Sequence, residues 1–329
     1  MLIRIVVPDD FPRFIGGTSA EDRLRTLGEV TLYDSDAGDA AELIRRMSAA
    51  DVAVAIYTKT KWTDTVLASC PRLRLISRCG TGLDGIELEA CRRRGVAVAH
   101  LIANNADEVA EHSIALMLNA LRRIGEVDRA LRAGHWDMAP ICGARGLTMG
   151  VVGLGAIGSR TAALARAIGM NVLAWSHGPD AGRAARVGAV WMEPDELLRR
   201  ADVVSLHLRL DPGTAGFIDA RRFGLMKPDA VLVNTARGGL VDRAALIDAL
   251  QRKRIAAAAL DVFHTEPLPA GDPLLSLPNV VLTPHDGGNI AAVTARGLMR
   301  AVENVASFLN GTPAGLAVDP GANARPGAG

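Results

Sequence analysis

The stretch TMGVVGLGAIGS, Thr148–Ser159, decides the fold of this 329-residue chain. An apolar run typical of a strand leads into a G-x-G-x-x-G pattern, and a helix-like stretch begins at its end. Gly153 would permit a tight turn, Gly155 would let a pyrophosphate approach the backbone, and Gly158 would allow the helix to pack close to the strand. The N–H groups at the start of that helix would bind the anion. The stretch therefore predicts a dinucleotide-binding turn.

Short apolar runs on both sides of this turn predict two sheets. Before the turn they are LIRIVV, VAVAIY, LRLISRC and VAVAH; from Leu147 onward they are TMGVVGLG, NVLAWS, DVVSLHL, AVLVNTA, AAAALDVF and NVVLTPH. Amphipathic stretches such as 40–49 and 87–94 separate them, and such alternation is typical of βα units with parallel strands. We expect an α/β protein with two Rossmann-like, doubly wound parallel-sheet domains and a cleft between them.

The length of the chain exceeds the usual domain size of about 100–200 residues, which also favours two domains. A long helical pattern over 105–131 lies between the two strand series, and a last one over 290–309 is expected to pack beside the first. We expect residues 1–100 plus 290–317 to bind the substrate and residues 101–289 to bind the dinucleotide. The tail 318–329 is rich in Gly, Pro and Ala, so disorder is expected there.

The balance of charges excludes several kinds of partner. The chain has 37 basic and 36 acidic residues, a net charge of +1, and no block of like charge, unlike a binder of nucleic acid or anionic membranes. Its start, MLIRIVVPDD, reads as a strand rather than a secretory signal, and no uncharged apolar run reaches the roughly 18 residues of a membrane span. The four cysteines lack metal-ligand spacing. We expect a cytoplasmic protein with a small-molecule partner and no metal.

The end of the second strand after the turn bears on the choice of cofactor. An Asp or Glu there normally accepts hydrogen bonds from the adenosine ribose, but this chain has Ser176, followed by His177 and later Arg183. The missing acid and the possible phosphate partners favour NADP. NAD is the alternative, with Ser176 bonded to the ribose and Arg183 in solvent.

Three later segments, NTARGG (234–239), DVFHTEP (261–267) and TPHDGG (283–288), follow predicted strands, where ligands bind in open α/β sheets. Arg237 offers a planar fork for a carboxylate and its neighbouring carbonyl oxygen. His285 can exchange a proton near neutral pH, and Glu266 could hold its protonated imidazole.

Alone, each of these three residues could be a helix cap, a surface charge or a loop histidine; together they favour an acid/base site. The other six histidines have no acid partner that the sequence identifies, so we do not expect them to be catalytic: His100, His112, His135, His177, His207 and His264.

Together with GLGAIG, these segments closely resemble the D-isomer-specific 2-hydroxyacid dehydrogenases, a family that includes phosphoglycerate dehydrogenases, glyoxylate/hydroxypyruvate reductases and formate dehydrogenases. The resemblance covers roughly Val52 to Leu309. It implies hydride transfer between NAD(P)H and C2 of a small 2-oxo acid such as glyoxylate or hydroxypyruvate, in a homodimer that pairs around the 105–131 helix. Alternatives are a phosphoglycerate, phosphite or formate type of dehydrogenase, or a dinucleotide-sensing binding protein like the corepressors that share this fold.

The resemblance also implies further site residues. Cofactor contacts would be Gly153, Gly155, Ala156, Ile157, Gly158, Ser176, His177, Arg183, His207, Leu208, Thr81, Thr235, Ala236, Asp261 and Gly287, with Asp261 near the nicotinamide amide. Substrate contacts would be Arg78, Cys79, Gly80, Thr81, Gly82, Tyr57 and Arg237, with backbone N–H groups of the 78–84 loop receiving a carboxylate. That loop could instead be an ordinary glycine turn.

Two departures from the family pattern bear on the substrate. Tyr57 stands where phosphoglycerate dehydrogenases tend to have an arginine for the phosphate, which disfavours phosphoglycerate, although Lys59 is close in sequence. Asp286 follows His285 where the family often has an apolar residue, and its charge could raise the pKa of His285 or contact a polar substrate.

Overall fold

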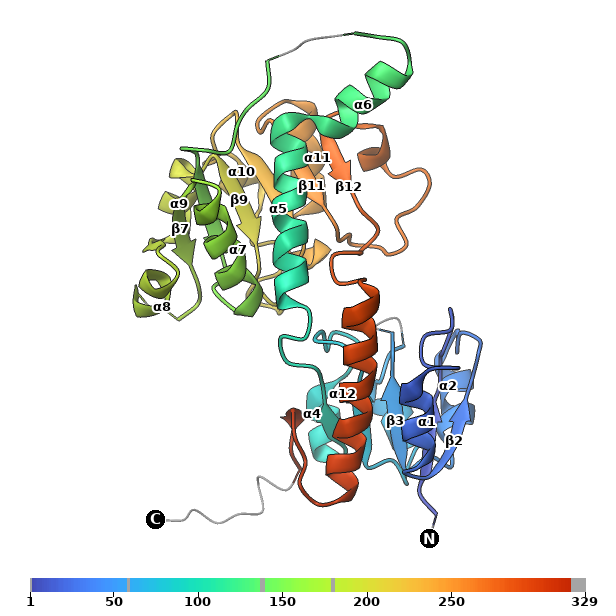
Figure 1. Cartoon of the computed structure of the whole chain (residues 1–329). Helices are drawn as coiled ribbons and strands as arrows, with labels where there is room; N and C mark the ends of the chain where they lie inside the picture. The colour runs from blue at the N-terminus through green and yellow to red at the C-terminus, as the bar shows by residue number, and fades with distance from the viewer. Residues whose placement is uncertain (1, 58–59, 137–139, 179–180, 321–329) are drawn as a thin grey trace. The chain divides into compact units, whose positions relative to one another are not determined.

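A computed structural model describes residues 2–57, 60–136, 140–178 and 181–320 of the chain (Figure 1). The chain forms two compact units. Unit 1 comprises Met1–Asn104 and Ile290–Gly329, and unit 2 comprises Asn105–Asn289. The sequence analysis placed the first boundary after residue 100 and the second after residue 289.

Unit 1 contains a six-stranded sheet in the order β13-β5-β4-β3-β1-β2. Its strands are β1 (Arg4–Val7), β2 (Glu29–Leu32), β3 (Val52–Ala55), β4 (Leu75–Arg78), β5 (Ala97–Ala99) and β13 (Leu316–Val318). All neighbours pair in parallel except β13, which runs antiparallel to β5. From β1 the chain first builds β2 on one side and then β3 on the other. The strand order thus reverses between β1 and β3, and open α/β sheets bind ligands at such a point, beyond the carboxyl ends of the strands.

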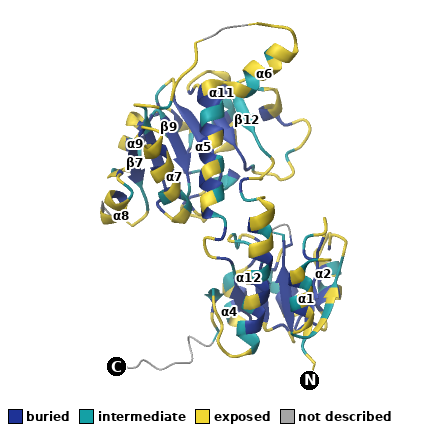
Figure 2. Cartoon of the chain, in the orientation of Figure 1, coloured by how far each residue is buried: buried dark blue, intermediate teal, exposed yellow. Residues whose placement is uncertain are grey.

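Helices cover both faces of this sheet. They are α1 (Ser19–Arg25), α2 (Ala40–Met47), α3 (Asp64–Ala68), α4 (Leu88–Arg93) and α12 (Ala291–Leu309). Alternate strand residues point to opposite faces, so Ile5 and Val7 pack with α1 and α12, whereas Val6 packs with α2, α3 and α4. Figure 2 shows the buried strands between helices whose outer sides are exposed. The Ser77 hydroxyl donates to the Ala301 carbonyl at 2.7 Å, which ties α12 to the sheet.

Unit 2 contains a seven-stranded parallel sheet in the order β12-β11-β10-β9-β6-β7-β8. Its strands are β6 (Thr148–Val152), β7 (Asn171–Trp175), β8 (Val190–Trp191), β9 (Val203–Leu206), β10 (Val231–Asn234), β11 (Ala257–Leu260) and β12 (Val280–Leu282). The order reverses between β6 and β9. The glycine-rich turn follows β6 and therefore lies at the switch point of this sheet.

Helices form a layer on each face of the unit 2 sheet (Figure 1). The helices of unit 2 are α5 (Ala106–Arg122), α6 (Ile124–Arg132), α7 (Ala156–Ala167), α8 (Ala181–Arg186), α9 (Pro194–Arg200), α10 (Ala220–Phe223) and α11 (Arg243–Gln251), with short 3-10 turns η1 (Gly238–Leu240) and η2 (Pro273–Ser276). Helix α6 has no buried residue and belongs to neither layer. Helices α5 and α7 pack on the face that includes Val151 and Val233. Helices α9, α10 and α11 pack on the face that includes Val204 and Leu232.

The two parallel sheets with helices on both faces confirm the predicted α/β class. The sequence analysis missed β2, β8 and β13, which are short and only partly buried, so they carry little hydrophobic pattern. Disorder was wrongly predicted at Val318, because this residue is fully buried in β13; residues 321–329 of the predicted tail lie outside the described residues. None of the described helices is long and apolar enough to cross a membrane.

The single helix expected over 105–131 is also wrong. Arg123 has a φ of +52°, in the left-handed region, and this residue ends α5 and precedes α6. The side chain of Asn119 stabilises the break, because its Oδ1 accepts from the backbone N–H of Gly125 at 3.0 Å. An apolar pattern that continues through one left-handed residue does not reveal such a break.

Candidate active site

The three glycines of the turn after β6 have different surroundings. Gly153 has a φ of +107°, and a Cβ atom there would lie 2.6 Å from the carbonyl oxygen of His207. At Gly158 a Cβ atom would overlap the carbonyl oxygen of Gly153. At Gly155 a Cβ atom would meet no heavy atom within 4 Å. The first and third glycines therefore allow close backbone packing, and the second borders open space that a ligand backbone or phosphate can enter.

The N-terminus of α7 adds hydrogen-bond donors to this turn. Gly155 is its N-cap and provides no side-chain hydrogen bond, and no acidic residue occupies the first turn. The first backbone N–H groups of a helix have no intrahelical acceptor and carry a partial positive charge. Ala156 and Ile157 lie at this end, so the turn fits the pyrophosphate of a dinucleotide.

Beside the turn, the carboxyl ends of β7 and β9 supply the other predicted cofactor residues. The Ser176 hydroxyl donates to the carbonyl of Gly178 at 3.0 Å, and Arg183 reaches back to the carbonyl of Leu154, with Nη1 at 3.4 Å. His207 lies 2.8 Å from the Ser205 hydroxyl through Nε2, and burial lowers its pKa to about 4. His207 is therefore neutral at physiological pH, and Leu208 beside it is buried.

Arg237 is held by the buried side chain of Asn234 at the end of β10. Asn234 Nδ2 donates to the carbonyl of Arg237 at 2.9 Å, and its Oδ1 accepts from the N–H of Ala236 at 3.1 Å. A Cβ atom on Gly238 would overlap the backbone of Phe263, so the Arg237 turn lies directly against the segment that leads to Glu266. The sequence analysis assigned no role to Asn234. Its position, as a polar residue at the end of an otherwise apolar strand, was the sequence feature that could have indicated this role.

Glu266 and His285 form a hydrogen-bonded pair. Glu266 Oε2 lies 2.7 Å from Nδ1 of His285, and Glu266 Oε1 accepts from the N–H of Phe263 at 2.9 Å. The hydrogen bond with Glu266 raises the pKa of His285; burial and the charge of Arg237 oppose this effect, and the charge of Asp261 adds to it.

The pKa of the Glu266 carboxyl shifts in the opposite direction. Burial would raise its pKa, but the hydrogen bonds from His285 and from the Phe263 N–H, with the charge of Arg237, bring that pKa below its usual value. Glu266 thus stays ionised while His285 keeps its proton to a higher pH than a free imidazole. Because Nδ1 is bonded to Glu266, the proton available for transfer is the one on Nε2.

Asp261 holds the loop that carries His285. Its Oδ1 accepts from the Asp286 N–H at 2.8 Å and from the Thr283 hydroxyl at 2.6 Å, and its Oδ2 accepts from the Gly287 N–H at 3.0 Å. The Asp261 side chain is only 3% exposed. Most of its hydrogen-bonding capacity is directed at this loop, and a contact with the nicotinamide amide stays a prediction.

His112 on α5 was expected to have no acid partner, and this expectation is wrong. Its Nε2 lies 3.4 Å from Asp261 Oδ1 and 3.0 Å from the Thr283 hydroxyl. The next residue, Ser113, is buried and lies 2.7 Å from Thr235 through the two hydroxyl oxygens. The partners are far apart in sequence, and only a helix packed under three strand ends brings them together.

The predicted substrate residues lie at the carboxyl ends of β3 and β4 in unit 1. Arg78 is buried, and its Nη1 donates to the carbonyls of Ala55 at 3.1 Å, Cys79 at 3.0 Å and also Ile56. The Tyr57 hydroxyl donates to the carbonyl of Pro12 at 2.6 Å, and burial raises the pKa of Tyr57 to about 12. Lys59 lies outside the described residues.

The loop after β4 is held by its neighbours. The carbonyl of Gly80 accepts from the N–H of Leu101 at 3.0 Å, and Nδ1 of His100 lies 3.1 Å from the carbonyl of Thr81. Burial raises the pKa of the Cys79 thiol to about 11, so this cysteine stays protonated at neutral pH. The structure thus groups Arg237, Glu266 and His285 in unit 2, and places Tyr57, Arg78 and the 79–82 loop at one edge of the unit 1 sheet.

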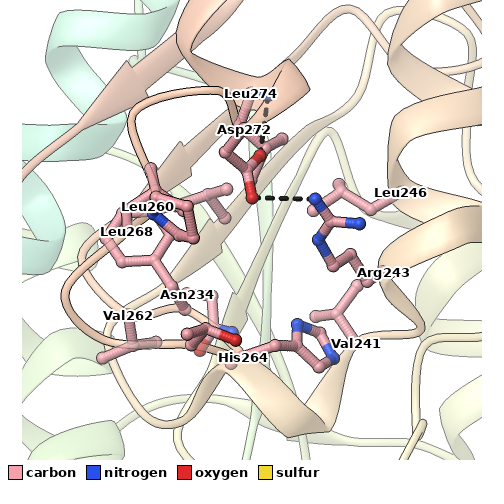
Figure 3. A pocket seen from close by; sticks show the side chains of 14 residues that line it. Asn234, Val241, Arg243, Leu246, Leu260, Val262, His264, Leu268, Asp272 and Leu274 are labelled. Atoms are coloured by element: carbon pink, nitrogen blue, oxygen red, sulfur yellow. Dashed lines mark hydrogen bonds and ion pairs between the residues drawn. The ribbon is translucent and has the colours of Figure 1, made fainter.

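A small hollow of about 100 Å³ borders the segment Phe263–Thr265 that precedes Glu266 (Figure 3). An ion pair lines its wall, with Arg243 Nη2 2.8 Å from Asp272 Oδ2, and Asp272 also accepts from the Leu274 N–H at 3.0 Å. Arg237 and His285 are not among its lining residues. The hollow therefore adjoins the Glu266 loop but does not include Arg237, Glu266 or His285.

A doubly wound sheet, a glycine turn open at its second position, and an Arg, Glu and His at strand ends define a dinucleotide-binding α/β protein with acid/base chemistry. The sequence profile described as D-isomer specific 2-hydroxyacid dehydrogenase, NAD binding domain, matches residues 114–287. The chain therefore belongs to the D-isomer-specific 2-hydroxyacid dehydrogenase family, as the sequence analysis predicted.

Two curated relatives illustrate the range of named activities. The chain is 40% identical over 307 residues to the D-3-phosphoglycerate dehydrogenase of Mycobacterium leprae, a match that covers 92% of this chain and 58% of that protein. It is 37% identical over 278 residues to the glyoxylate reductase of Aeropyrum pernix, covering 80% of this chain and 82% of that protein. The chain thus spans somewhat over half the length of the phosphoglycerate dehydrogenase relative.

Solved structures with this fold have been described with either nicotinamide cofactor. The D-lactate dehydrogenase of Aquifex aeolicus, complexed with NAD and lactic acid, has a TM-score of 0.83 and 30% identity, covering 94% of this chain and 96% of that one. An acyclic imino acid reductase, Bsp5, in complex with NADPH and D-Arg, has a TM-score of 0.86 and 27% identity, covering 96% and 100%. The cofactor of this family is a nicotinamide dinucleotide.

Proposed function

We propose that this protein transfers a hydride between NAD(P)H and C2 of a small 2-oxo or 2-hydroxy acid, with Arg237, Glu266 and His285 as its catalytic residues. The observation that carries the proposal is the 2.7 Å contact between Glu266 and His285. Arg237 lies close enough for its charge to act on both groups. Three complementary groups at neighbouring strand ends suit acid/base chemistry on an anionic substrate.

The bound cofactor supplies or accepts the hydride, and the side chains handle the proton and the substrate charge. The Arg237 guanidinium binds the substrate carboxylate and the oxygen on C2. In reduction, the Nε2 proton of His285 moves to that oxygen as C2 gains the hydride, which leaves a neutral imidazole and a hydroxyl group. In oxidation, neutral His285 removes the same proton. Glu266 stabilises the protonated imidazole and fixes its orientation.

In unit 1, the 79–82 loop is the proposed binding site for the substrate carboxylate through its backbone N–H groups. The buried guanidinium of Arg78 donates to the carbonyl of Ala55 at the end of β3 and to the carbonyl of Cys79, the first residue of this loop, and so holds the loop in place. Arg78 therefore supports the loop, and Cys79, Gly80, Thr81 and Gly82 supply the backbone that the substrate meets.

For the substrate, we propose glyoxylate or hydroxypyruvate, because Tyr57 presents a neutral aromatic ring, not a cation, at the ligand-binding edge of unit 1. The alternative is D-3-phosphoglycerate, which is favoured by a different observation: a relative 40% identical to this chain is named D-3-phosphoglycerate dehydrogenase. The two readings predict opposite preferences for a phosphate group on C3.

A substrate panel separates these readings. We would measure kcat/KM for glyoxylate, hydroxypyruvate and 3-phosphohydroxypyruvate from nicotinamide absorbance, with both cofactors, and use His285→Ala as the control for background oxidation. The proposal expects the unphosphorylated acids to be preferred. At least a tenfold preference for the phosphorylated acid would establish the alternative. Turnover of formate or phosphite only, or cofactor binding without turnover, would contradict a role for His285 and Glu266 in proton transfer.

For the cofactor, we propose NADP, with NAD as the alternative. Ser176 replaces the usual acid at the end of β7, and Arg183 reaches from α8 towards the glycine turn. A cation near that end of the site would attract the extra phosphate of NADP. We expect Ser176→Asp to shift the ratio of kcat/KM values towards NADH, and Arg183→Ala to weaken NADPH selectively. At least a tenfold preference of the unaltered protein for NADH would overturn the proposal.

We also propose a homodimer that pairs around α5 and α6. Helix α6 has no buried residue, yet Ile124, Val127 and Leu131 lie one and two turns apart and are 56%, 44% and 52% exposed. Trp136, just beyond the helix, is 79% exposed. An apolar stripe of this kind is typical of an interface. Light scattering should show a dimer that Leu131→Glu converts to a monomer, whereas Glu29→Gln, a change of an exposed charge in unit 1, should leave it unaffected.

A further inference from the structure

One face of α5 packs under the strand ends of unit 2 that carry the proposed catalytic residues. Two consecutive residues of this helix contact two different strand ends. His112 lies 3.0 Å from Thr283, which follows β12, and Ser113 lies 2.7 Å from Thr235, which follows β10. Between these strands is β11, which is followed by Asp261. The helix thus contacts the base of the loops that carry Arg237 and His285.

The direction of the hydrogen bonds follows from the number of protons available. The Asp261 carboxylate is an acceptor, so the single hydroxyl proton of Thr283 is donated to Asp261 Oδ1, at 2.6 Å. The Thr283 oxygen can then only accept from His112, at 3.0 Å. Nε2 of His112 must therefore carry a proton. The chain of donors runs from His112 through Thr283 to Asp261.

Asp261 in turn determines the conformation of the loop that contains His285. The backbone of His285 has a φ of +59°, a conformation that residues with a Cβ rarely adopt. The N–H groups of the two residues that follow, Asp286 and Gly287, both donate to the Asp261 carboxylate, at 2.8 and 3.0 Å. Those two bonds hold the turn in the conformation that brings the His285 imidazole to Glu266.

The charges around both histidines are consistent with this arrangement. His112 faces Asp261 and Asp286, and the hydrogen bond with Asp261 raises the pKa of His112, against the opposing effect of burial. His285 faces Glu266, Arg237 and Asp261. Burial would raise the pKa of Asp261, but the hydrogen bonds from His112, Thr283 and the loop bring it below its usual value. Asp261 therefore remains an anion, and its charge raises the pKa of both histidines.

We propose that His112 is a positioning residue for the acid/base histidine: it acts through Thr283 and Asp261 to hold the left-handed turn at His285. His112 touches neither the substrate nor the reacting atoms in this proposal. The inference rests on the proposed function, in which His285 transfers the proton. Its structural part, the dependence of the His285 environment on His112, can be tested without any turnover.

The first test is an NMR titration of the full chain labelled at histidine Cε1, with His285 assigned from His285→Ala. His112→Leu removes the donor, and His112→Gln keeps an N–H group that can reach Thr283. We expect the His285 pKa to fall towards that of a free imidazole in His112→Leu, because the turn loosens and the bond to Glu266 weakens. His112→Gln should stay close to the unaltered protein. Glu111→Gln, an exposed neighbour on α5, is the control.

A pure charge effect gives a different result. If His112 acted only as a cation near Asp261, its removal would raise the His285 pKa, and it would do so equally in the Leu and Gln variants. That outcome, or an unchanged titration in both variants, overturns the positioning role. Failure of the protein to turn over any acid would overturn the proposed function and leave this titration interpretable.

The second test uses turnover and a different link in the chain of donors. We expect His112→Leu and Thr283→Val each to lower kcat by about ten- to hundredfold, because small misplacements of a catalytic group are costly, with a smaller change in KM. His112→Gln and Thr283→Ser keep the hydrogen bonds and should restore most of the rate. The double variant His112→Leu/Thr283→Val should be little worse than either single one, since both break one pathway. Additive losses would contradict it. The threonine pair alone still tests the proposal if His112→Leu does not fold.

Discussion

At the carboxyl edge of the unit 2 sheet, the side chains of Glu266 and His285 pair with each other, whereas at the same edge of unit 1 the charged side chains of Arg78 and Asp10 bind the backbone. Glu266 and His285 contact at 2.7 Å and remain partly exposed, with side chains 36% and 43% accessible. In unit 1, the buried Arg78 donates to carbonyls, and the buried Asp10 accepts from the N–H groups of Phe14, at 2.6 Å, and Ile15, at 2.9 Å.

The difference indicates that charged side chains have different roles in two sheets of the same class. In unit 2, partly exposed side chains form the pair to which we assign proton transfer, and the loops that carry them are held by the less exposed Asn234 and Asp261. Unit 1 uses buried charges to shape loops, so that backbone groups are what it can offer a substrate. A charged residue after a strand is therefore weak evidence of catalysis until its hydrogen-bond partners are known.

The largest expected effect comes from removing the acid/base group of unit 2. His285→Ala should lower kcat by about 10²- to 10⁴-fold, the usual contribution of a positioned general acid, while the cofactor Kd changes little. Steady-state rates and a fluorescence titration of the cofactor would test this. Near-native turnover of this variant would show that His285 is not the acid/base group, and the proposed difference between the two sheet edges would then be lost.

Two glycines of the turn after β6, Gly158 and Gly155, allow a second comparison, within unit 2. Gly158→Ala should reduce the free energy of unfolding by about 3 kcal/mol, because the new methyl group overlaps a backbone oxygen that cannot move away cheaply. Gly155→Ala is the matched control: it should keep its stability in urea but bind the dinucleotide more weakly, because its methyl group fills the open space. Equal losses of stability in the two variants would refute the assignment of different roles.

A smaller effect tests the structural use of charge in unit 1. Arg78→Met keeps the apolar stem and removes the guanidinium, which leaves backbone carbonyls without donors. We expect the free energy of unfolding to fall by about 2 kcal/mol, as for other charged hydrogen bonds, with a much smaller loss of kcat than in His285→Ala. Urea denaturation and steady-state kinetics would measure both. Unchanged stability with a large rise in KM would place Arg78 on the substrate, as the family resemblance implies.

The smallest expected effect is a displacement of the pH profile. Glu266 raises the pKa of His285 through their hydrogen bond, so Glu266→Gln should lower it. Reduction needs protonated His285 and is lost as pH rises through this pKa; its alkaline limb should therefore move to lower pH in the variant. Oxidation needs the neutral imidazole, so its acidic limb should move the same way. Profiles of kcat/KM in both directions would show this, and an unmoved limb would separate Glu266 from the titration of His285.

The sequence predicted those parts of the molecule that depend on local pattern. The glycine turn, the α/β class and the strand ends that carry Arg237, Glu266 and His285 all rest on a few consecutive residues. The break at Arg123 and the short strand β13 could not be predicted, because one residue with positive φ, and a strand of three residues of which only Val318 is buried, leave the hydrophobic pattern almost unchanged.

Contacts between segments that are distant in the sequence also could not be predicted. His112 and Asp261 become partners only because α5 packs under β11, and no spacing in the sequence relates them. For Arg78, the family resemblance implied a substrate contact, whereas in the structure this residue is buried and its guanidinium donates to backbone carbonyls. The type of each side chain indicated which chemistry it could perform. Its burial determined whether its charge faces a ligand or binds the backbone.

The left-handed backbone at His285 sets two requirements on this position against each other: glycine would give the more stable protein, and histidine is needed for the proposed proton transfer. A residue with a Cβ atom costs about 1 kcal/mol or more in this conformation, and glycine would adopt it freely. Selection for stability alone would favour glycine there, whereas the proposed role of His285 in proton transfer requires the imidazole. Lineages of this protein that adapt to high temperature should therefore keep the histidine and accumulate their stabilising replacements elsewhere.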